Sequence, residues 1–389
     1  MGILGLTKLI HTRAPDSVKD EEMKNYFGRK IAIDASMTIY QFIIAMKGYE
    51  GGERTELTNE KGEVTSHLNG LWARCIRMLE EGIKPVYVFD GAPPEMKRLE
   101  LEERKAKAAE AEAALQKATE EGDDEAMEKF SKRTVRVSRD QMEECKKLLK
   151  LMGIPVVDAA SEAEAQCAEL VRAGKCWAVA TEDMDALTFG APILLRHLTY
   201  SQSKDRPVAE FRFDGVLQQM QFTRDQFIEL CILLGCDYCD KIPGIGPTKA
   251  YDGIDKYKTI EAFVASLDQA KYPIPENWRY DEARELFKNP PVTPAAEVVI
   301  EFKPPDAEGL MKFMVEEKLF NKERIEKGIA KLKAAGEKKV QGRLDDFFKI
   351  IPKALPPAPK PGARKRSASN NGAPPVPGKK GAVKKAVQK

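Results

Sequence analysis

Carboxylate side chains follow several short apolar runs in this sequence, and their placement indicates chemistry. The runs at residues 31–33, 86–89, 155–157 and 177–180 are brief and rich in β-branched or aromatic residues, which is typical of buried strands. A further acid follows the helical run 227–235. The acids concerned are Asp34, Asp90, Glu162, Glu164, Asp183, Asp185 and Asp237.

Metal binding is the chemistry that such a group of acids supports. In a parallel α/β sheet, ligands bind in the crevice at the carboxyl ends of the strands. Acids gathered there repel one another, which raises their pKa values, and divalent cations remove this penalty. Carboxylate oxygens suit Mg²⁺ or Mn²⁺, and a site for two such ions needs many of them. The pattern therefore predicts metal-assisted phosphodiester chemistry.

Each pair of closely spaced acids also has an ordinary structural explanation. Asp183 and Asp185 are two residues apart, as are the two glutamates, so each pair converges on one site only from a loop or a frayed helical turn. Acids at a helix N-terminus complement the helix dipole, and Ser161-x-x-Glu164 matches a capping box. One pair alone favours that explanation. Two pairs, together with acids at two strand ends, favour the metal site.

The elements that must position these acids alternate from residue 30 to about residue 200. Helical patterns at 36–46, 66–81, 138–152 and 162–173 separate the strands, and a fifth strand is predicted near 192–196. This alternation predicts an α/β fold with a mixed, mostly parallel central sheet flanked by helices. Residues 214–335 have the pattern of helices joined by short loops.

A long polar helical segment at residues 95–135 leaves the predicted sheet shortly after Asp90. It has no continuous apolar stripe, so it bridges solvent or packs little. Lys97 and Arg104 are seven residues apart, which places them on one face of a helix. Such residues are usually surface charge. Beside Asp90, however, they are candidates to hold a phosphate over the metal site and to stabilise developing charge.

A glycine-rich turn, Ile-Pro-Gly-Ile-Gly-Pro, separates two helical patterns at residues 242–247. The glycines let backbone N–H groups turn outward, and Pro247 suits the first turn of the next helix. These N–H groups and the helix dipole then face one phosphate. The turn is similar to a helix-hairpin-helix element, which binds duplex DNA without reading its sequence, and a plain interhelical turn is the alternative. The candidate contacts are Gly244, Ile245, Gly246 and Lys249.

The chain loses its helical periodicity after Gly336. An apolar cluster there has the spacing of a short helical turn that presents side chains to a pocket, and a last core-packing helix is the alternative. Residues 351–389 contain ten Lys or Arg, eight Pro and no acid, so we expect a disordered basic tail for nuclear import or nonspecific nucleic-acid contact. The apolar cluster, which resembles the sliding-clamp-interacting box, consists of Gln341, Leu344, Phe347 and Phe348.

Charge and cysteine usage narrow the class of protein. The net charge is +2, but residues 1–350 hold 53 basic against 61 acidic residues, so nucleic acid must meet local basic patches. Seven scattered cysteines favour a reduced, intracellular protein. Cys236-x-x-Cys239 has a zinc or redox spacing, but no second pair and no nearby His completes a site. No apolar stretch reaches membrane-spanning length, so no membrane partner is expected.

Together, the motifs identify the chain as similar to the flap endonucleases of the structure-specific 5′ nuclease superfamily, of the eukaryotic replicative type. The likeness extends from Met1 to about Lys349. The segments that carry it are Met1-Gly2-Ile3-x-Gly5-Leu6, Ile33-Asp34-Ala35-Ser36, Val88-Phe89-Asp90-Gly91, Glu162-Ala163-Glu164-Ala165, Thr181-Glu182-Asp183-Met184-Asp185, Leu234-Gly235-Cys236-Asp237-Tyr238 and Gly244-Ile245-Gly246-Pro247.

This resemblance implies roles for the residues named above. The seven acids hold two Mg²⁺ ions, for which Mn²⁺ substitutes, some of them through water, and Lys97 and Arg104 are catalytic cations at the base of a helical arch. A K⁺ ion accompanies the helix-hairpin-helix turn. Tyr40 stacks on a base near the cleavage point, Gly2 lies near the active site, and Arg74 is a further expected DNA contact. The implied organisation is a nuclease core at 1–335 with the arch at 95–135 and the helix-hairpin-helix region at 214–260, a clamp-binding segment at 336–350 and a tail at 351–389.

The implied activity is structure-specific 5′ flap endonuclease, with 5′–3′ exonuclease activity, in Okazaki fragment maturation and base excision repair. The expected partners are branched DNA with a 5′ flap and the sliding clamp, proliferating cell nuclear antigen, which binds residues 341–348 of a monomer. The expected location is the nucleus, including nucleoplasm and nucleolus, with the mitochondrion as a second location. Two alternatives remain. A paralogous exonuclease or junction resolvase shares the core, and a catalytically idle scaffold is expected to lack some of the acids.

Overall fold

The computed structural model describes residues 2–46, 48–50, 53–55, 63–200 and 206–337. The chain divides into two units, residues 1–340 and 341–389, and the fold below is that of the first unit. The predicted clamp-binding residues 341–348 and the predicted basic tail lie outside the described residues. None of the helices in the described ranges combines the length and the apolar character that crossing a bilayer requires.

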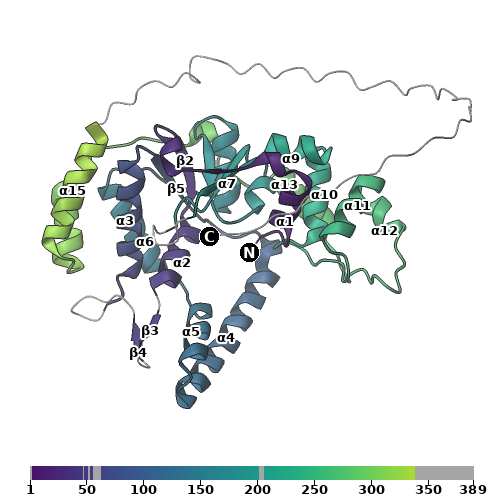
Figure 1. Cartoon of the computed structure of the whole chain (residues 1–389), viewed down its shortest axis with the longest axis horizontal. Helices are drawn as coiled ribbons and strands as arrows, with labels where there is room; N and C mark the ends of the chain where they lie inside the picture. Colours follow the sequence, from purple (N-terminus) through teal and green to yellow (C-terminus); the bar gives the residue numbers. More distant parts are fainter. Residues whose placement is uncertain (1, 47, 51–52, 56–62, 201–205, 338–389) are drawn as a thin grey trace, which may run out of the picture. The chain divides into compact units, whose positions relative to one another are not determined.

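A seven-stranded mixed sheet organises the first unit, which confirms the predicted fold class (Figure 1). The five strands from β8 to β6 are parallel, and β9 and β1 extend one edge with antiparallel pairing. The strands predicted from the apolar runs are all among the parallel five. In spatial order, the sheet consists of β1 (Val18–Glu21), β9 (Val208–Arg212), β8 (Ile193–Arg196), β7 (Ala178–Ala180), β2 (Lys30–Asp34), β5 (Lys84–Phe89) and β6 (Val156–Asp158).

Two hydrophobic cores cover the two faces of the sheet, because successive side chains of a strand point to opposite sides. In β2, Ala32 lies in one core, whereas Ile31 and Ile33 lie in the other. In β5, Val86 lies in the same core as Ala32, and Tyr87 lies in the other core. The first core contains side chains of α1 (Leu6–Arg13), α7 (Ala163–Arg172), α9 (Phe213–Met220) and α10 (Arg224–Leu234), and the second those of α2 (Ala35–Met46), α3 (Ser66–Glu80), α6 (Arg139–Leu151) and α15 (Lys322–Glu337).

The four helices predicted between the parallel strands are α2, α3, α6 and α7, and each agrees with its predicted range to within one residue at either end. The remaining elements, in which η marks short 3₁₀ or π segments, are η1 (Pro15–Ser17), η2 (Met23–Tyr26), β3 (Gly48–Glu50), β4 (Glu53–Thr55), η3 (Glu95–Lys97), α4 (Arg98–Glu121), α5 (Asp124–Arg133), α8 (Asp185–Thr188), α11 (Pro247–Tyr257), α12 (Ile260–Ala265), α13 (Tyr280–Lys288), η5 (Ala295–Glu297), α14 (Ala307–Leu310) and η6 (Met311–Glu317).

Two edge strands and one extended segment depart from the sequence-based expectation. β1 and β9 carry charged residues and lack the continuous apolar run that marks the parallel strands. Residues 289–306, expected among helices with short loops, contain only the short helix η5. The backbone of this segment instead forms hydrogen bonds with residues that are far away in the sequence. The Lys303 N–H donates to the Gly153 carbonyl at 3.0 Å, and the Asp306 N–H donates to the Leu151 carbonyl at 2.8 Å. Because these hydrogen bonds are tertiary, the sequence of the segment has no local periodicity from which its structure could be predicted.

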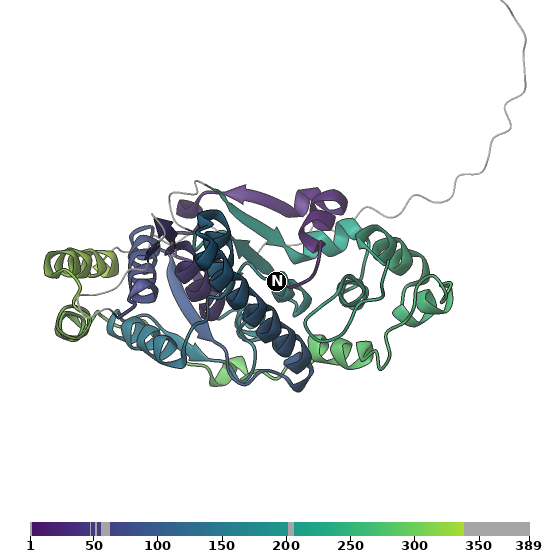
Figure 2. The ribbon, with the colours of Figure 1, turned by 90° about the horizontal axis from the view of Figure 1, so that it is seen from below.

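The predicted polar segment forms a helical hairpin of α4 and α5, which projects away from the sheet and its covering helices (Figure 1). Seen from below, α4 crosses the middle of the view beside the N-terminal segment (Figure 2). The buried apolar residues of the hairpin are Ala111, Ala118 and Met127. With so little apolar packing, the hairpin depends on polar contacts where it joins the sheet.

The packing of α15 against α3 depends on Gly328, which faces Trp72. A Cβ atom at position 328 would lie 2.3 Å from Trp72 Cζ2, and the indole is buried. We expect Gly328→Ala to lower the free energy of unfolding by about 1–3 kcal/mol, the range for overpacking a core. Gly336→Ala, on the same helix where a Cβ meets nothing within 4 Å, is the matched control. Urea unfolding measures both variants, and equal stability of the two would contradict this packing.

Candidate metal centre

The carboxyl ends of three neighbouring strands bring acids to one edge of the sheet. Asp34 is the last residue of β2, Asp90 directly follows β5, and Asp183 follows the end of β7. β2 pairs in parallel with both β5 and β7, so the three strand ends lie side by side. The fold therefore delivers the predicted acids to the crevice where open α/β sheets bind ligands.

Asp34 is the most deeply buried of these acids, with 1% of its surface exposed. Its carboxylate accepts hydrogen bonds from the Met37 N–H at 3.0 Å and from the Thr181 hydroxyl at 2.9 Å. Burial and the negative charge of Asp90 nevertheless raise the pKa of Asp34 to about 7. The ionised carboxylate is therefore costly here unless a cation joins it.

Asp90 fixes the start of α7, on which the two glutamates lie. Glu162 is the N-cap residue of α7, but the capping bond comes from Asp90, whose Oδ1 accepts from the Ala163 N–H at 2.8 Å. Ser161 donates to the Ala92 carbonyl at 2.9 Å, so the capping box that the sequence allows does not form. The contact between Asp90 and α7 couples the end of β5 to the glutamate pair.

Asp183 and Asp185 lie at the start of α8, and the N-terminal segment covers them. Asp183 Oδ1 accepts from the Asp185 N–H at 3.0 Å, and both side chains are buried. Asp185 Oδ1 has no hydrogen-bond partner. Gly2 has φ of +71°, and a Cβ atom there would lie 1.9 Å from Asp183 Oδ1. A side chain at position 2 would therefore displace an acid of the site, which is a physical reason for glycine.

Burial, together with repulsion within the group, raises two more pKa values. Loss of hydration, followed by the charges of Asp34 and its neighbours, raises the pKa of Glu164 well above its usual range. Loss of hydration and the charge of Asp183 do the same for Asp185. The acids are thus held together by the fold against their own electrostatic preference.

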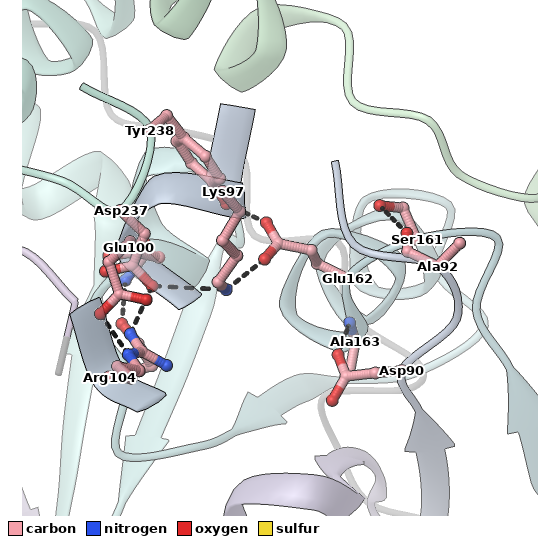
Figure 3. A network of polar contacts seen from close by, with 12 residues as sticks. Asp90, Ala92, Lys97, Glu100, Arg104, Ser161, Glu162, Ala163, Asp237 and Tyr238 are labelled. Carbon is pink, nitrogen blue, oxygen red and sulfur yellow. Dashed lines mark hydrogen bonds and ion pairs between the residues drawn. The ribbon is translucent and has the colours of Figure 1, made fainter. Parts of the chain in front are cut away.

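The base of α4 supplies positive charge to this group (Figure 3). Lys97 Nζ hydrogen-bonds with Glu162 and lies 3.3 Å from Asp237 Oδ2. Arg104 donates through Nη2 to Asp237 Oδ2 at 2.8 Å and through Nε to Glu100. One ammonium group therefore bridges the start of α7 and the loop after α10, and both predicted cations reach Asp237.

Lys97 remains protonated in this position. Burial by itself lowers the pKa of Lys97, but the charge of Glu162, with those of Glu164 and Asp237, outweighs burial and raises the pKa. The helical spacing of Lys97 and Arg104 predicted only that they share a face of α4. The structure shows that this face is turned towards the acids.

Three residues of the site are not among the predicted ones. The Tyr238 hydroxyl is buried and donates to Glu162, Thr181 donates to Asp34, and Glu100 accepts from Arg104. Tyr238 and Thr181 lie next to predicted acids in the sequence motifs. This proximity in sequence was the signal that could have identified them as site residues. The acid that each one contacts is distant in sequence: Glu162 is 76 positions from Tyr238, and Asp34 is 147 positions from Thr181.

The donor set fits divalent cations. Carboxylates are the ligands that Mg²⁺ and Mn²⁺ prefer, three of these acids have raised pKa values, and one buried oxygen of Asp185 lacks a partner. Among the described residues, no three potential ligands lie close enough together to enclose one ion in this arrangement. Glu162 and Asp237 instead bind the cations Lys97 and Arg104.

The predicted helix-hairpin-helix turn connects α10 to α11, beyond the loop that carries Asp237. Gly244 has φ of +79°, Gly246 is the N-cap residue of α11, and Pro247 lies in its first turn. A Cβ atom on Gly246 would meet nothing within 4 Å, so the backbone here is open to a ligand. The first N–H groups of a helix have no partner within it, so the start of α11 suits a phosphate oxygen.

Two of the candidate phosphate contacts in this turn are engaged within the protein. Ile245 is buried, and its N–H donates to the Ile242 carbonyl at 3.2 Å, so this residue shapes the turn. Lys249 Nζ donates to the Gly244 carbonyl at 3.2 Å and to the Tyr272 hydroxyl at 2.8 Å. Lys249 is exposed, so its ammonium group can exchange these partners for a phosphate.

Tyr40 and Arg74 lie on helices of the second core. Tyr40 is half-buried on α2 and packs against that core. Arg74 on α3 donates through Nε to the Thr199 carbonyl at 2.6 Å, and its guanidinium lies 3.8 Å from the centre of the Phe42 ring. Arg74 thus ties α3 to α2 and to the segment after β8, while its contact with DNA stays a prediction.

Comparisons with known proteins agree with one another. Residues 1–111 match the XPG N-terminal domain, and residues 153–237 match the XPG I-region. The chain is 64% identical over 350 residues to Flap endonuclease 1 of Trypanosoma cruzi, which spans 90% of this chain and 89% of that protein. The solved flap endonuclease-1 from Methanococcus jannaschii is 33% identical, with a TM-score of 0.63, over 82% of this chain and 96% of that one. The catalytic core of Rad2 in complex with DNA substrate, 22% identical with a TM-score of 0.65 over 85% of this chain and all of that one, shows the fold alone.

The raised pKa of Asp34 predicts a pH-dependent stability. The pKa is about 7 in the folded protein and 3.8 ordinarily, so between these values the folded state keeps a proton that the unfolded chain has lost, and stability falls as pH rises. Without metal, the stability advantage of Asp34→Asn over the wild type should grow from about pH 4 to about pH 7 and then level off. Thermal unfolding in chelator measures this advantage, with the exposed Asp158→Asn as the control. An advantage that does not change with pH would show that another group titrates.

Proposed function

The chain belongs to the flap endonuclease 1 family, and from this premise we propose that its acidic site binds two divalent metal ions, Mg²⁺ in the cell. The protein is a structure-specific flap endonuclease, with 5′–3′ exonuclease activity, that removes 5′ flaps in Okazaki fragment maturation and base excision repair. The observation that carries the metal assignment is the group of acids at the ends of β2, β5 and β7 and at the starts of α7 and α8. Within this group, Asp34, Glu164 and Asp185 have raised pKa values.

The proposed ligands are the seven acids predicted from the sequence. When bound, the two ions supply a hydroxide nucleophile and stabilise the leaving oxygen of an in-line displacement. The chain's own residues prepare the ligands. Thr181 and the Met37 N–H orient Asp34, the start of α7 orients Asp90, and Tyr238 orients Glu162.

Lys97 and Arg104 change partners in the proposed reaction. Without metal, they neutralise Glu162 and Asp237. Glu162 and Asp237 would be ligands of bound divalent ions, which would supply the neutralising charge, and Lys97 and Arg104 would then be available to the phosphate beside the site. There they stabilise the charge that develops on the phosphate oxygens in the transition state. This exchange needs no large movement, since both cations already contact the acids.

Contacts outside the acidic site position the DNA in this proposal. The start of α11, with Gly244, Gly246 and Lys249, holds one phosphate of the duplex, together with a K⁺ ion at the turn. Tyr40 stacks on a base, as an aromatic side chain on the helix that follows Asp34. Arg74 and Arg77 line a cleft of about 630 Å³ between α3 and α15, where the basic residues outnumber Glu80 and Glu323. Such a surface attracts a phosphate backbone.

We also propose that the protein acts as a monomer in the nucleus, including the nucleolus, and in the mitochondrion, and that residues 341–348 bind the sliding clamp. The spacing of Gln341, Leu344, Phe347 and Phe348 supports clamp binding, and the basic composition of residues 351–389 supports the nuclear location. A short segment with a few apolar anchors is suited to fold on a partner.

Asp183→Ala tests the metal assignment. Removing this acid weakens metal binding and reduces repulsion with phosphate, so the variant should bind a 5′-flap substrate at least as well as the wild type. It should cut that substrate orders of magnitude more slowly in Mg²⁺. Single-turnover cleavage and a binding titration in Ca²⁺ measure the two effects. Asp158→Ala, which removes an exposed acid at the end of β6, is the matched control. Normal cleavage by Asp183→Ala would end the two-metal proposal.

Lys97→Ala tests the role of the arch base. Loss of a preorganised charge that stabilises the transition state should slow single-turnover cleavage by about 10²-fold or more, with little change in duplex affinity. The same variant leaves Glu162 without its cation, so Mg²⁺ should raise its melting temperature by more than it raises that of the wild type. Lys107→Ala, an exposed residue of α4 paired with Glu103, serves as control. If affinity alone falls, Lys97 positions DNA and is not catalytic.

The pair of phenylalanines after the folded unit tests the clamp assignment. Phe347→Ala with Phe348→Ala removes two apolar anchors, which should cost several kcal/mol of binding and abolish clamp-stimulated cleavage. Cleavage without the clamp and the melting temperature should stay unchanged. Isothermal titration against the clamp and a thermal melt measure these quantities, with Lys349→Ala as the control. A large fall in melting temperature would assign the two rings to the core.

A further inference from the structure

Cys236 and Cys239 stand at the two ends of the loop segment that carries Asp237 and Tyr238. Among the seven cysteines, all of which are free thiols, five are buried and this pair is partly exposed. The two residues form an isolated antiparallel bridge, and their sulfur atoms lie 3.7 Å apart with one thiol hydrogen-bonded to the other. Directly paired antiparallel residues have Cα atoms about 4.5–5.5 Å apart, which lies within the range that a disulfide accepts.

We propose that Cys236 and Cys239 form a reversible disulfide, and that this bond lowers nuclease activity under oxidising conditions by displacing Asp237 and Tyr238. A disulfide needs no further ligand, unlike a zinc site. The absence of a second cysteine pair and of a nearby His therefore does not weigh against it. The effect on cleavage rests on the proposed function of the acidic site, whereas formation of the bond does not.

The two residues between the cysteines make direct contacts with the site. Asp237 Oδ2 accepts from Arg104 at 2.8 Å and lies 3.3 Å from Lys97 Nζ, and the Tyr238 hydroxyl donates to Glu162. A disulfide is about 2.05 Å long, so the two sulfur atoms must approach each other by about 1.7 Å. Rotation of the two side chains supplies part of this movement, and the ring that the bond closes transmits the rest to the backbone that carries Asp237 and Tyr238.

The chemistry balances with a low-molecular-weight disulfide as the oxidant. The first of the two thiols to lose its proton attacks one sulfur of that disulfide, which releases one small thiolate and leaves a mixed disulfide on the protein. The second protein thiol loses its proton and attacks the protein sulfur of the mixed disulfide, which releases the second small thiolate. Two protein thiols are oxidised, the small disulfide is reduced to two thiols, and these take up both protons.

Oxidised glutathione acting on the reduced full-length protein tests the proposal. We expect the peptide with both cysteines to lose two hydrogens by mass spectrometry, while the five buried cysteines remain open to alkylation after denaturation. Single-turnover cleavage of a 5′-flap substrate in Mg²⁺ should slow by about 10–100-fold, the scale for small displacements of metal ligands and their supports. Dithiothreitol should restore it. A peptide that stays reduced overturns the inference, whereas a reduced protein that cuts no flap contradicts the proposed function alone.

Cys236→Ser separates the effect of the disulfide from other effects of the oxidant. This variant cannot close a disulfide with Cys239, so its cleavage should stay unchanged after the same treatment. Equal inhibition of this variant and the wild type would show that a glutathione adduct on Cys239 blocks the site, and would overturn the proposal. Inhibition of the wild type that a zinc-selective chelator reverses in excess Mg²⁺, and that dithiothreitol does not reverse, would show capture of a metal ion by the two thiols and would overturn the proposal as well.

Discussion

Repulsion among carboxylates at the carboxyl end of the sheet is the constraint on which the rest of this structure depends. The parallel pairing of β2 with β5 and β7 places Asp34, Asp90 and Asp183 at neighbouring strand ends. The same arrangement raises the pKa values of Asp34, Glu164 and Asp185. The two hydrophobic cores supply the free energy that holds these acids together, and cations make the arrangement tolerable. The gathered carboxylates therefore favour the binding of positive charge in the ligand-free protein.

The attachment of α4 follows from this constraint. A helix that is polar on all sides has little apolar surface to bury, so packing cannot hold it against the sheet. Its contacts with the site are instead the ion pairs of Lys97 and Arg104 with Glu162 and Asp237. Ion pairs can exchange partners, whereas an apolar contact can only be broken. In the proposed reaction, metal ions and a phosphate replace the contacts that hold the base of α4, which couples substrate binding to the position of this helix.

One loop connects the acidic site to the turn that is proposed to bind duplex DNA. The chain from Gly235 to Gly246 carries Asp237 near its start and the proposed phosphate-binding turn at its end, where α11 begins. Because this loop is short and Ile242 and Ile245 anchor it in the core, the distance between Asp237 and the turn is fixed by packing. In the proposed function, a phosphate held at the start of α11 is consequently at a set distance from the proposed metal ligand Asp237. The same rigidity makes the loop sensitive to a new covalent bond between Cys236 and Cys239.

By itself, the sequence determined the parallel strands, the helices between them and the acids at the strand ends, because apolar runs and helical periodicity are local signals. It also determined that Lys97 and Arg104 share one face of a helix. Only the tertiary structure decided that Asp90, and not Ser161, caps α7, that Tyr238 belongs to the site, and that β1 and β9 form an edge of the sheet. Arg104 and Asp237 are 133 residues apart, so no local pattern contains their contact. Such partners are chosen by packing and charge over the whole fold.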